Sequence, residues 1–143
     1  MNRFILTLFA GFILFTGSCG GEVSISISIP AASSPEITLV RFSPTSALLN
    51  EGDGIVTCSA AIDFFDPDAD VSSLTVSVVD SHGFLVSQTV MSLPGLTGFS
   101  RGTIPFTLDF NTGIIESYTF TAFVTDRSGR MSNPVFGTFR VLP

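Results

Sequence analysis

From Glu36 onward, apolar residues alternate with serine and threonine in short runs, which glycine, proline, asparagine and aspartate separate. This alternation has the two-residue period of a β-strand with one buried face, and no stretch has a convincing helical period. The separating residues are those that favour turns. The pattern therefore predicts an all-β chain with seven strands, over residues 36–42, 54–64, 72–80, 84–91, 103–110, 117–126 and 134–142.

Within most of these strands every second residue is apolar, so that each strand offers one face to a hydrophobic core. The residues expected on these faces are Val56, Cys58, Ala60, Ile62, Phe64, Leu74, Val76, Val78, Ile104, Phe106, Leu108, Phe110, Tyr118, Phe120, Ala122, Val124, Phe139 and Val141. Seven strands in about 100 residues favour an immunoglobulin-like antiparallel β-sandwich over residues 36–143. A small β-barrel is the alternative fold.

Three residues refine this prediction. Pro105 lies inside the fifth strand, and because proline cannot donate a ladder hydrogen bond, that strand is expected at a sheet edge. Tyr118 precedes Phe120 by two residues, as the tyrosine corner of immunoglobulin domains precedes the second disulfide cysteine. Phe120 thus stands in that cysteine's place, opposite Cys58 on the second strand. We expect a core closed by phenylalanine packing.

The N-terminus carries a separate signal. A positive charge precedes the apolar run Phe4–Phe15, which is shorter than the roughly 20 residues that span a bilayer and has the length of a signal-peptide core. The following Gly17-Ser18-Cys19 resembles the lipobox of bacterial lipoproteins, although Thr16 stands where that family usually has leucine. The resemblance implies a signal peptide at residues 1–18 and a lipidated Cys19 at the mature N-terminus. An ordinary secretory signal is the alternative.

Such a lipid would anchor the protein in the bacterial cell envelope, and glycine after Cys19 resembles lipoproteins of the outer membrane in Gram-negative hosts. It would also leave Cys58 as the only thiol, without an intramolecular disulfide partner. Pairing between chains is then one option, but the strand-interior setting of Cys58 favours a buried, free thiol. Residues 19–35 are expected to form a lipidated tether, and its alternating segment 23–29 either forms a strand or stays unpaired.

The net charge of the chain limits the classes of partner that it could bind. The chain has a formal net charge of −6 and no lysine, which argues against binding to nucleic acid and against electrostatic binding to anionic lipid headgroups. Membrane attachment is therefore expected through the N-terminal lipid alone. The expected partner is an unidentified envelope protein or polysaccharide.

Three segments resemble known modules. Residues 116–134 look like the F strand, the F–G turn and the start of the G strand of bacterial fibronectin type III-like, Ig-like and cadherin-like domains. Residues 65–70 are similar to the Asp-Pro-Asp-Gly-Asp motif of bacterial cadherin-like modules, with Ala69 in place of the glycine. Residues 108–113 resemble their Asp-x-x-Thr-Gly turn. The chain lacks the tryptophan that fibronectin and immunoglobulin domains usually bury, and these short motifs imply a fold, not a family.

The aspartate-rich loop is the first candidate site. Asp66, Asp68 and Asp70 alternate along a predicted loop, where several carboxylates could bind one Ca²⁺ ion. In an antiparallel sandwich, Asp126 would approach the same point from the loop after the sixth strand. The alternative is a plain solvated turn, because aspartate and proline favour turns for their own backbone geometry.

His82 is the only histidine, in the predicted hairpin turn Asp80-Ser81-His82-Gly83. Counting histidine and cysteine alone, we expect no zinc or copper site, and no catalytic residue or other cofactor. The predicted function is a non-enzymatic, lipid-anchored envelope module for binding or structure. The alternatives are a calcium-dependent adhesion or carbohydrate-recognition domain and, third, an envelope hydrolase.

Overall fold

The computed structural model describes residues 33–143. The predictions for the signal peptide 1–18, for Cys19 and for the segment 23–29 lie outside these residues. Within the described part, no helix is long and apolar enough to cross a membrane.

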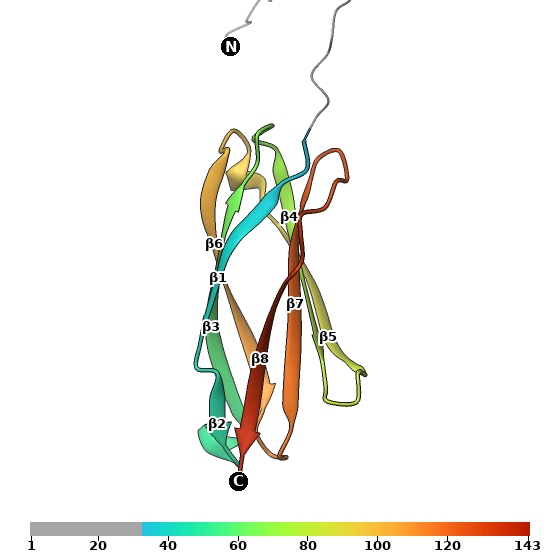
Figure 1. Cartoon of the computed structure of the whole chain (residues 1–143). Helices are drawn as coiled ribbons and strands as arrows, with labels where there is room; N and C mark the ends of the chain where they lie inside the picture. The colour runs from blue at the N-terminus through green and yellow to red at the C-terminus, as the bar shows by residue number, and fades with distance from the viewer. Residues whose placement is uncertain (1–32) are drawn as a thin grey trace, which may run out of the picture. The chain divides into compact units, whose positions relative to one another are not determined.

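Eight strands form two sheets that pack face to face (Figure 1). The three-stranded sheet has the order β1-β3-β6, with β1 at Glu36–Ser43, β3 at Ile55–Phe65 and β6 at Arg101–Asn111. The five-stranded sheet has the order β2-β8-β7-β4-β5, with β2 at Ser46–Leu48, β8 at Val135–Leu142, β7 at Ser117–Asp126, β4 at Val71–Val79 and β5 at Leu85–Ser92. All neighbours are antiparallel except β2 and β8. The predicted all-β fold and the immunoglobulin-like β-sandwich are confirmed.

The predicted strands differ from the observed ones only by a residue or two at their ends, but the count of seven is one short. After β1 the chain crosses to the other sheet at Pro44, and the additional strand β2 pairs in parallel with β8. Its three residues bury only Ala47, so the sequence pattern there is too short to detect. Two short 3₁₀ turns, Glu51–Gly54 and Pro94–Leu96, are the helical elements of the described part.

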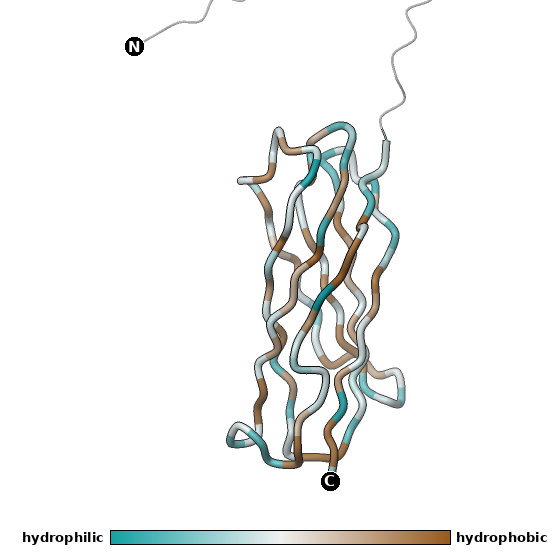
Figure 2. Tube along the Cα trace, turned by 60° about the vertical axis from the view of Figure 1, so that its left-hand side comes forward, coloured by the Kyte–Doolittle hydropathy of each residue, from teal (hydrophilic) through white to brown (hydrophobic). Residues whose placement is uncertain are grey.

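The apolar side chains of the predicted alternating pattern fill the space between the two sheets. Figure 2 shows hydrophobic and hydrophilic positions alternating along the strands. All the residues expected in the core are buried, apart from Val56 and Leu108, which are partly buried against it. By contrast, every residue of β5 is exposed, because this strand extends the five-stranded sheet beyond the three-stranded one as an edge.

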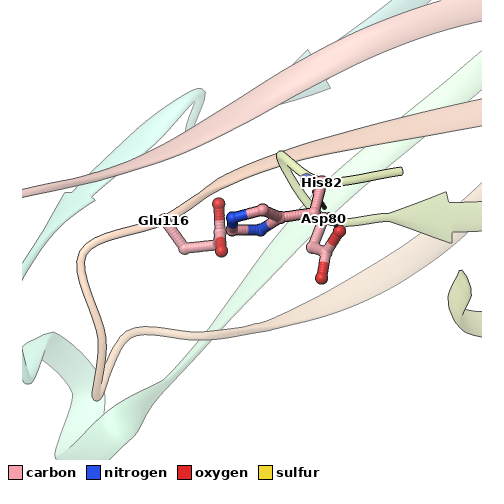
Figure 3. Close-up of side chains that lie close together, drawn as sticks. All are labelled: Asp80, His82 and Glu116. Carbon is pink, nitrogen blue, oxygen red and sulfur yellow. Dashed lines mark hydrogen bonds between the residues drawn. The ribbon is translucent and has the colours of Figure 1, made fainter. Parts of the chain in front are cut away.

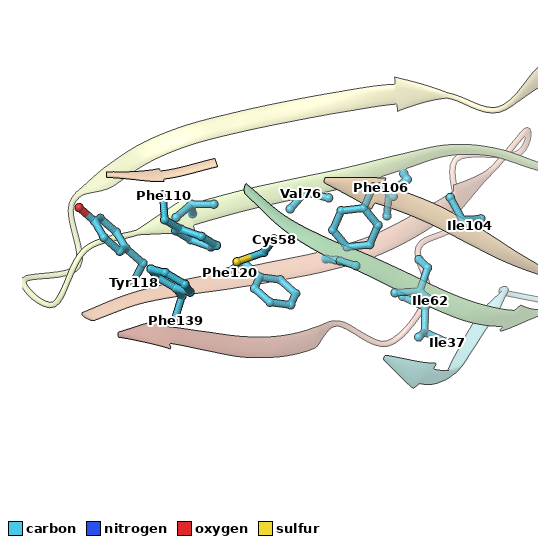
Figure 4. Packing of buried hydrophobic residues seen from close by; sticks show 14 of the residues in the cluster. Ile37, Cys58, Ile62, Val76, Ile104, Phe106, Phe110, Tyr118, Phe120 and Phe139 are labelled. Carbon is cyan, nitrogen blue, oxygen red and sulfur yellow. The ribbon is translucent and has the colours of Figure 1, made fainter. Parts of the chain in front are cut away.

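Aromatic packing closes the core, as the sequence predicts. Cys58 is a free cysteine with no exposed surface, and Figure 4 shows it beside the rings of Phe110, Phe120 and Phe139. The rings of Phe110 and Phe139 stack with centroids 4.4 Å apart. The Cys58 Sγ donates a hydrogen bond to the Pro44 carbonyl oxygen over 3.1 Å. The site of an immunoglobulin disulfide is therefore occupied by a thiol and phenylalanine rings.

Two further predictions are confirmed. The Tyr118 hydroxyl donates to the Asn111 carbonyl oxygen over 3.2 Å, which is the tyrosine-corner contact that fixes the β6–β7 loop. Strand β6, which contains Pro105, has β3 as its only neighbour among the described residues and is thus a sheet edge. Proline is tolerated there because its missing N–H would face away from the ladder.

Candidate functional site

The aspartate loop lies between β3 and β4, at the same end of the sandwich as the β7–β8 loop that follows Asp126 (Figure 1). The two loops are joined by a hydrogen bond from the Arg127 N–H to the Asp70 carbonyl oxygen, 3.1 Å long. The predicted approach of Asp126 to the aspartate loop is therefore observed. The four carboxylates at this end, those of Asp66, Asp68, Asp70 and Asp126, have different interactions.

Asp66 supports its own loop. It has no exposed surface, and its two oxygens accept the backbone N–H groups of Asp68 (3.3 Å) and Asp70 (2.8 Å). Ala69, at the glycine position of the motif, adopts a left-handed φ of 56°, a conformation that glycine adopts more readily. Asp66 therefore fixes the loop in the way that aspartate does in ordinary turns.

Asp126 and Asp68 face a cation of the chain itself. Asp126 is 2% exposed, and its Oδ1 accepts the Arg130 backbone N–H over 2.8 Å. The Arg130 Nη1 lies 3.5 Å from the Asp126 Oδ2 and 3.8 Å from the Asp68 Oδ2. Neither this Nη1 nor the Asp126 Oδ2 forms a hydrogen bond within the described residues. The guanidinium compensates the two charges without satisfying these atoms.

Asp70, the fourth carboxylate, has an unpaired oxygen and a raised pKa. Its Oδ1 is buried without a hydrogen-bond partner in the part of the chain described. Burial raises the pKa of Asp70 first, and the negative charges of Asp126, Asp66 and Asp68 raise it further. The Ca²⁺ site at these residues stays a prediction. Its unpaired buried oxygens favour a cation, whereas Arg130 competes for the same carboxylates.

A second group of ligand atoms lies at the other end of the sandwich. Among residues 33–143, Asp80, His82 and Glu116 each offer one ligand atom, and these atoms lie within 4.8 Å of one another (Figure 3). Asp80 and His82 come from the β4–β5 turn, and Glu116 directly precedes β7. His82 lies in a hairpin turn, as the sequence predicts. A count of histidine and cysteine alone does not identify Glu116, because it leaves out carboxylates as zinc ligands.

Hydrogen bonds to the backbone hold both carboxylates. The Asp80 Oδ1 accepts the N–H groups of His82 and Phe84, each over 2.9 Å. The Glu116 Oε1 accepts the N–H groups of Ser81 (3.3 Å) and Ser117 (2.7 Å). The Ser81 side chain contributes most to a lowered pKa of Glu116, followed by the Ser117 N–H, and the His82 ring contributes least. Glu116 is therefore an anion at neutral pH.

The same turn does not form a catalytic triad. The Ser81 Oγ lies 3.3 Å from the His82 Nδ1, but Asp80 accepts from the His82 backbone and not from its ring. A triad needs the carboxylate on the second ring nitrogen, where it orients the base. All three residues also belong to one short turn, in which His82 is exposed. The geometry therefore offers no support for the hydrolase alternative.

Hollows on the surface of the described domain include three of about 60 to 340 Å³. The first, of about 340 Å³, lies beside β2 and β8 and includes Arg140, and the second, of about 230 Å³, lies over β1 and β3 and includes Arg41. The third, of about 60 Å³, lies between the inner faces of β4, β5 and β6 and is largely apolar. None of the three is lined by histidine, cysteine, aspartate or glutamate.

No family model and no curated protein matches this sequence. Among solved structures, a β-glucuronidase from Parabacteroides merdae is similar with a TM-score of 0.55 and 13% identity, over 76% of this chain and 14% of the enzyme. A putative β-galactosidase from Bacteroides fragilis has a TM-score of 0.52 and 11% identity, over 77% of this chain and 18% of the enzyme. The PKD domain of an M14-like peptidase from a Thermoplasmatales archaeon has a TM-score of 0.49 and 16% identity, over 79% of this chain and 100% of that domain.

The likeness to the two glycosidases concerns the fold alone. This chain spans less than a fifth of either enzyme, at low identity. The strand order of the two sheets gives the fold independently. The described domain is an immunoglobulin-like β-sandwich.

Proposed function

We propose that this protein is a lipid-anchored component of the bacterial cell envelope, in which the immunoglobulin-like domain is a non-catalytic module for binding or structure. One observation carries the non-catalytic part. None of the three hollows described above contains a side chain that could act as a general acid, a general base or a thiol nucleophile. The buried polar side chains of the domain instead support loops, as Asp66 and Thr112 do.

The anchor rests on the sequence around Cys19. The acidic, lysine-free composition disfavours electrostatic attachment to anionic lipid, so the acyl chains would supply the membrane affinity. In a Gram-negative host, Gly20 favours the outer membrane. The partner we propose is an envelope protein or polysaccharide.

Metabolic labelling tests the anchor directly. Cells that express the wild-type chain and grow on [³H]palmitate should give a labelled protein in the membrane fraction, and Cys19→Ser should lose the label. Cys58→Ser is the matched control, because Cys58 is buried in the core and should not affect acylation. A label that persists in Cys19→Ser would overturn the anchor. A hydrolase activity of the purified protein that His82→Ala abolishes would overturn the non-catalytic assignment.

A second candidate function is calcium-dependent adhesion or carbohydrate recognition. The favouring observation is the pair of buried oxygens, Asp70 Oδ1 and Asp126 Oδ2, that lack hydrogen-bond partners among the described residues. Leaving such groups unpaired is costly, and a bound Ca²⁺ ion would satisfy them. If Ca²⁺ binds there, a chelator should lower the thermal midpoint of the wild type, and Asp126→Asn should remove this dependence. Asp53→Asn, at the other end of the domain, is the charge-matched control. No chelator effect on the wild type would exclude this function.

A further inference from the structure

We propose that Asp80, His82 and Glu116 form a binding site for a first-row divalent metal ion, with Zn²⁺ as the ion that best fits the ligand set. The site lies at the end of the sandwich opposite the aspartate loop, and it is separate from the Ca²⁺ prediction (Figures 1 and 3). One imidazole and two carboxylates are ligands that Zn²⁺ accepts. Ca²⁺ instead takes oxygen ligands, so the histidine distinguishes the two sites.

The ligands come from two loops that the fold brings together. Asp80 and His82 lie in the turn between β4 and β5, and Glu116 lies at the end of the β6–β7 loop. The Ser81 N–H bonds to the Glu116 Oε1 and thereby connects the two loops. The Val141 N–H bonds to the Glu116 carbonyl oxygen over 2.8 Å, which fixes the backbone at this residue.

Each carboxylate is oriented through one oxygen. The Asp80 Oδ1 and the Glu116 Oε1 each accept two backbone N–H groups. The second oxygen of each takes no part in these four bonds. Such outer hydrogen bonds commonly orient metal ligands and hold the remaining atom toward the ion.

The imidazole of His82 has two neighbours in its own turn. Its Nδ1 lies 3.3 Å from the Ser81 Oγ, and its ring is offset from that of Phe84, with centroids 6.4 Å apart and an interplanar angle of 29°. Because His82 is exposed, the ring can still rotate toward an ion. A hydroxyl beside the ring can select its tautomer, as the outer partner of a ligating histidine does.

The three ligand atoms must move slightly closer together to bind one Zn²⁺ ion. With Zn–N and Zn–O distances of about 2.0–2.1 Å, tetrahedral geometry separates neighbouring ligand atoms by about 3.3 Å. The three ligand atoms lie within 4.8 Å of one another, so the largest closure required is about 1.5 Å. A side-chain rotation of exposed His82 can supply a shift of this size. Three protein ligands leave a fourth position for water or for a donor from a partner.

Selective labelling gives a direct test, because His82 is the only histidine. The full chain, without a histidine tag and with Cys19→Ser to remove the N-terminal thiol, is labelled with [¹⁵N]histidine and titrated with ZnCl₂. We expect the imidazole nitrogen resonances to shift in a saturable manner, and CaCl₂ at the same concentrations to leave them unchanged. Glu116→Gln and Asp80→Asn should each weaken the Zn²⁺ affinity by more than about tenfold, at least the loss seen when an outer-shell partner is removed.

Asp53→Asn is the matched control, since it removes one exposed carboxylate at the same end of the domain and should retain the wild-type affinity. Thermal unfolding without metal checks that each variant is folded. His82→Ala, in an exposed turn, covers the case in which a carboxylate variant does not fold, and calorimetry should then record no Zn²⁺ binding. An unshifted imidazole at millimolar Zn²⁺, or equal binding by His82→Ala, would overturn the site.

Discussion

Among the glycines of the described residues, Gly137 is the one at which an added methyl group should destabilise the domain most. It lies on β8 directly opposite Phe120 of β7. A Cβ atom added there would lie 2.2 and 2.5 Å from two carbons of the Phe120 ring and 2.7 Å from a carbon of the Phe42 ring. Carbon atoms pack at about 3.5–4.0 Å, so Gly137→Ala requires the rings to move by about 1 Å or more.

The Phe120 ring has little room for that movement. It has no exposed surface, and it packs edge-on against Phe42 and Phe106, with centroids 5.0 and 6.4 Å away. Overpacking a dense core costs about 1–3 kcal/mol, and the rigid surroundings place Gly137→Ala at the upper end. Alanine loses less conformational entropy than glycine on folding, and this difference offsets about 0.5–1 kcal/mol of the packing cost. The net loss should be about 2 kcal/mol, or about 8–16 °C in thermal midpoint for a domain of this size.

Urea unfolding followed by far-ultraviolet circular dichroism measures this loss. Gly95→Ala is the matched control, because nothing lies within 4 Å of its added Cβ, and its stability should stay within about 0.5 kcal/mol of the wild type. Gly102→Ala, with its nearest contact at 2.9 Å from the Phe64 ring, should fall between the two. In a Phe120→Leu background, Gly137→Ala should cost clearly less, because the two positions share one space. Equal stability of Gly137→Ala and Gly95→Ala would refute the reasoning.

Three further predictions concern single side chains. Tyr118→Phe removes the hydroxyl that bonds to the Asn111 carbonyl oxygen and should cost about 1 kcal/mol in urea unfolding; no change would show that water replaces this contact. Burial, with a smaller effect of Asp109, raises the pKa of Cys58 from 9.0 to about 11. At pH 8 a disulfide reagent should therefore label the native thiol at least about 100-fold more slowly than the unfolded one, because the thiolate is the reacting form. Equal labelling rates would contradict the burial of Cys58. Because the pKa of Asp70 is raised, the native state gains stability as the pH falls through that pKa. In chelator, Asp70→Asn should therefore raise the thermal midpoint at pH 7 and have little effect near pH 3, where the carboxyl group is protonated in both states. A lower midpoint at pH 7 would show that the carboxylate is needed.

Local pattern was sufficient for seven of the eight strands in the described residues and for the faces that are buried. The two-residue period located β7 at 117–126, and it placed Cys58 and Phe120 in the core. Pro105 marked an edge strand and Tyr118 marked the corner, because each has a chemical property that restricts it to such a position. These features depend on neighbours in the sequence, so the sequence alone could reveal them.

Contacts between loops could be predicted only in part. Knowledge of the sandwich topology indicated that Asp126 would approach the aspartate loop, but not that Arg130 would lie between Asp126 and Asp68. The direction of a long side chain depends on the conformation of its turn and on which charges nearby are buried. Neither can be predicted from the period of hydrophobic residues.

The sequence by itself determined the all-β class, the inward faces and the absence of a disulfide partner for Cys58 among residues 33–143. Only the tertiary structure decided that β5 is an exposed edge strand, why Gly137 must lack a side chain, and that Glu116 meets Asp80 and His82. The physical reason is the sequence separation of the residues involved. Alternation is a property of consecutive residues, whereas these three results depend on strand order, register and loop geometry, which bring together residues far apart in the chain.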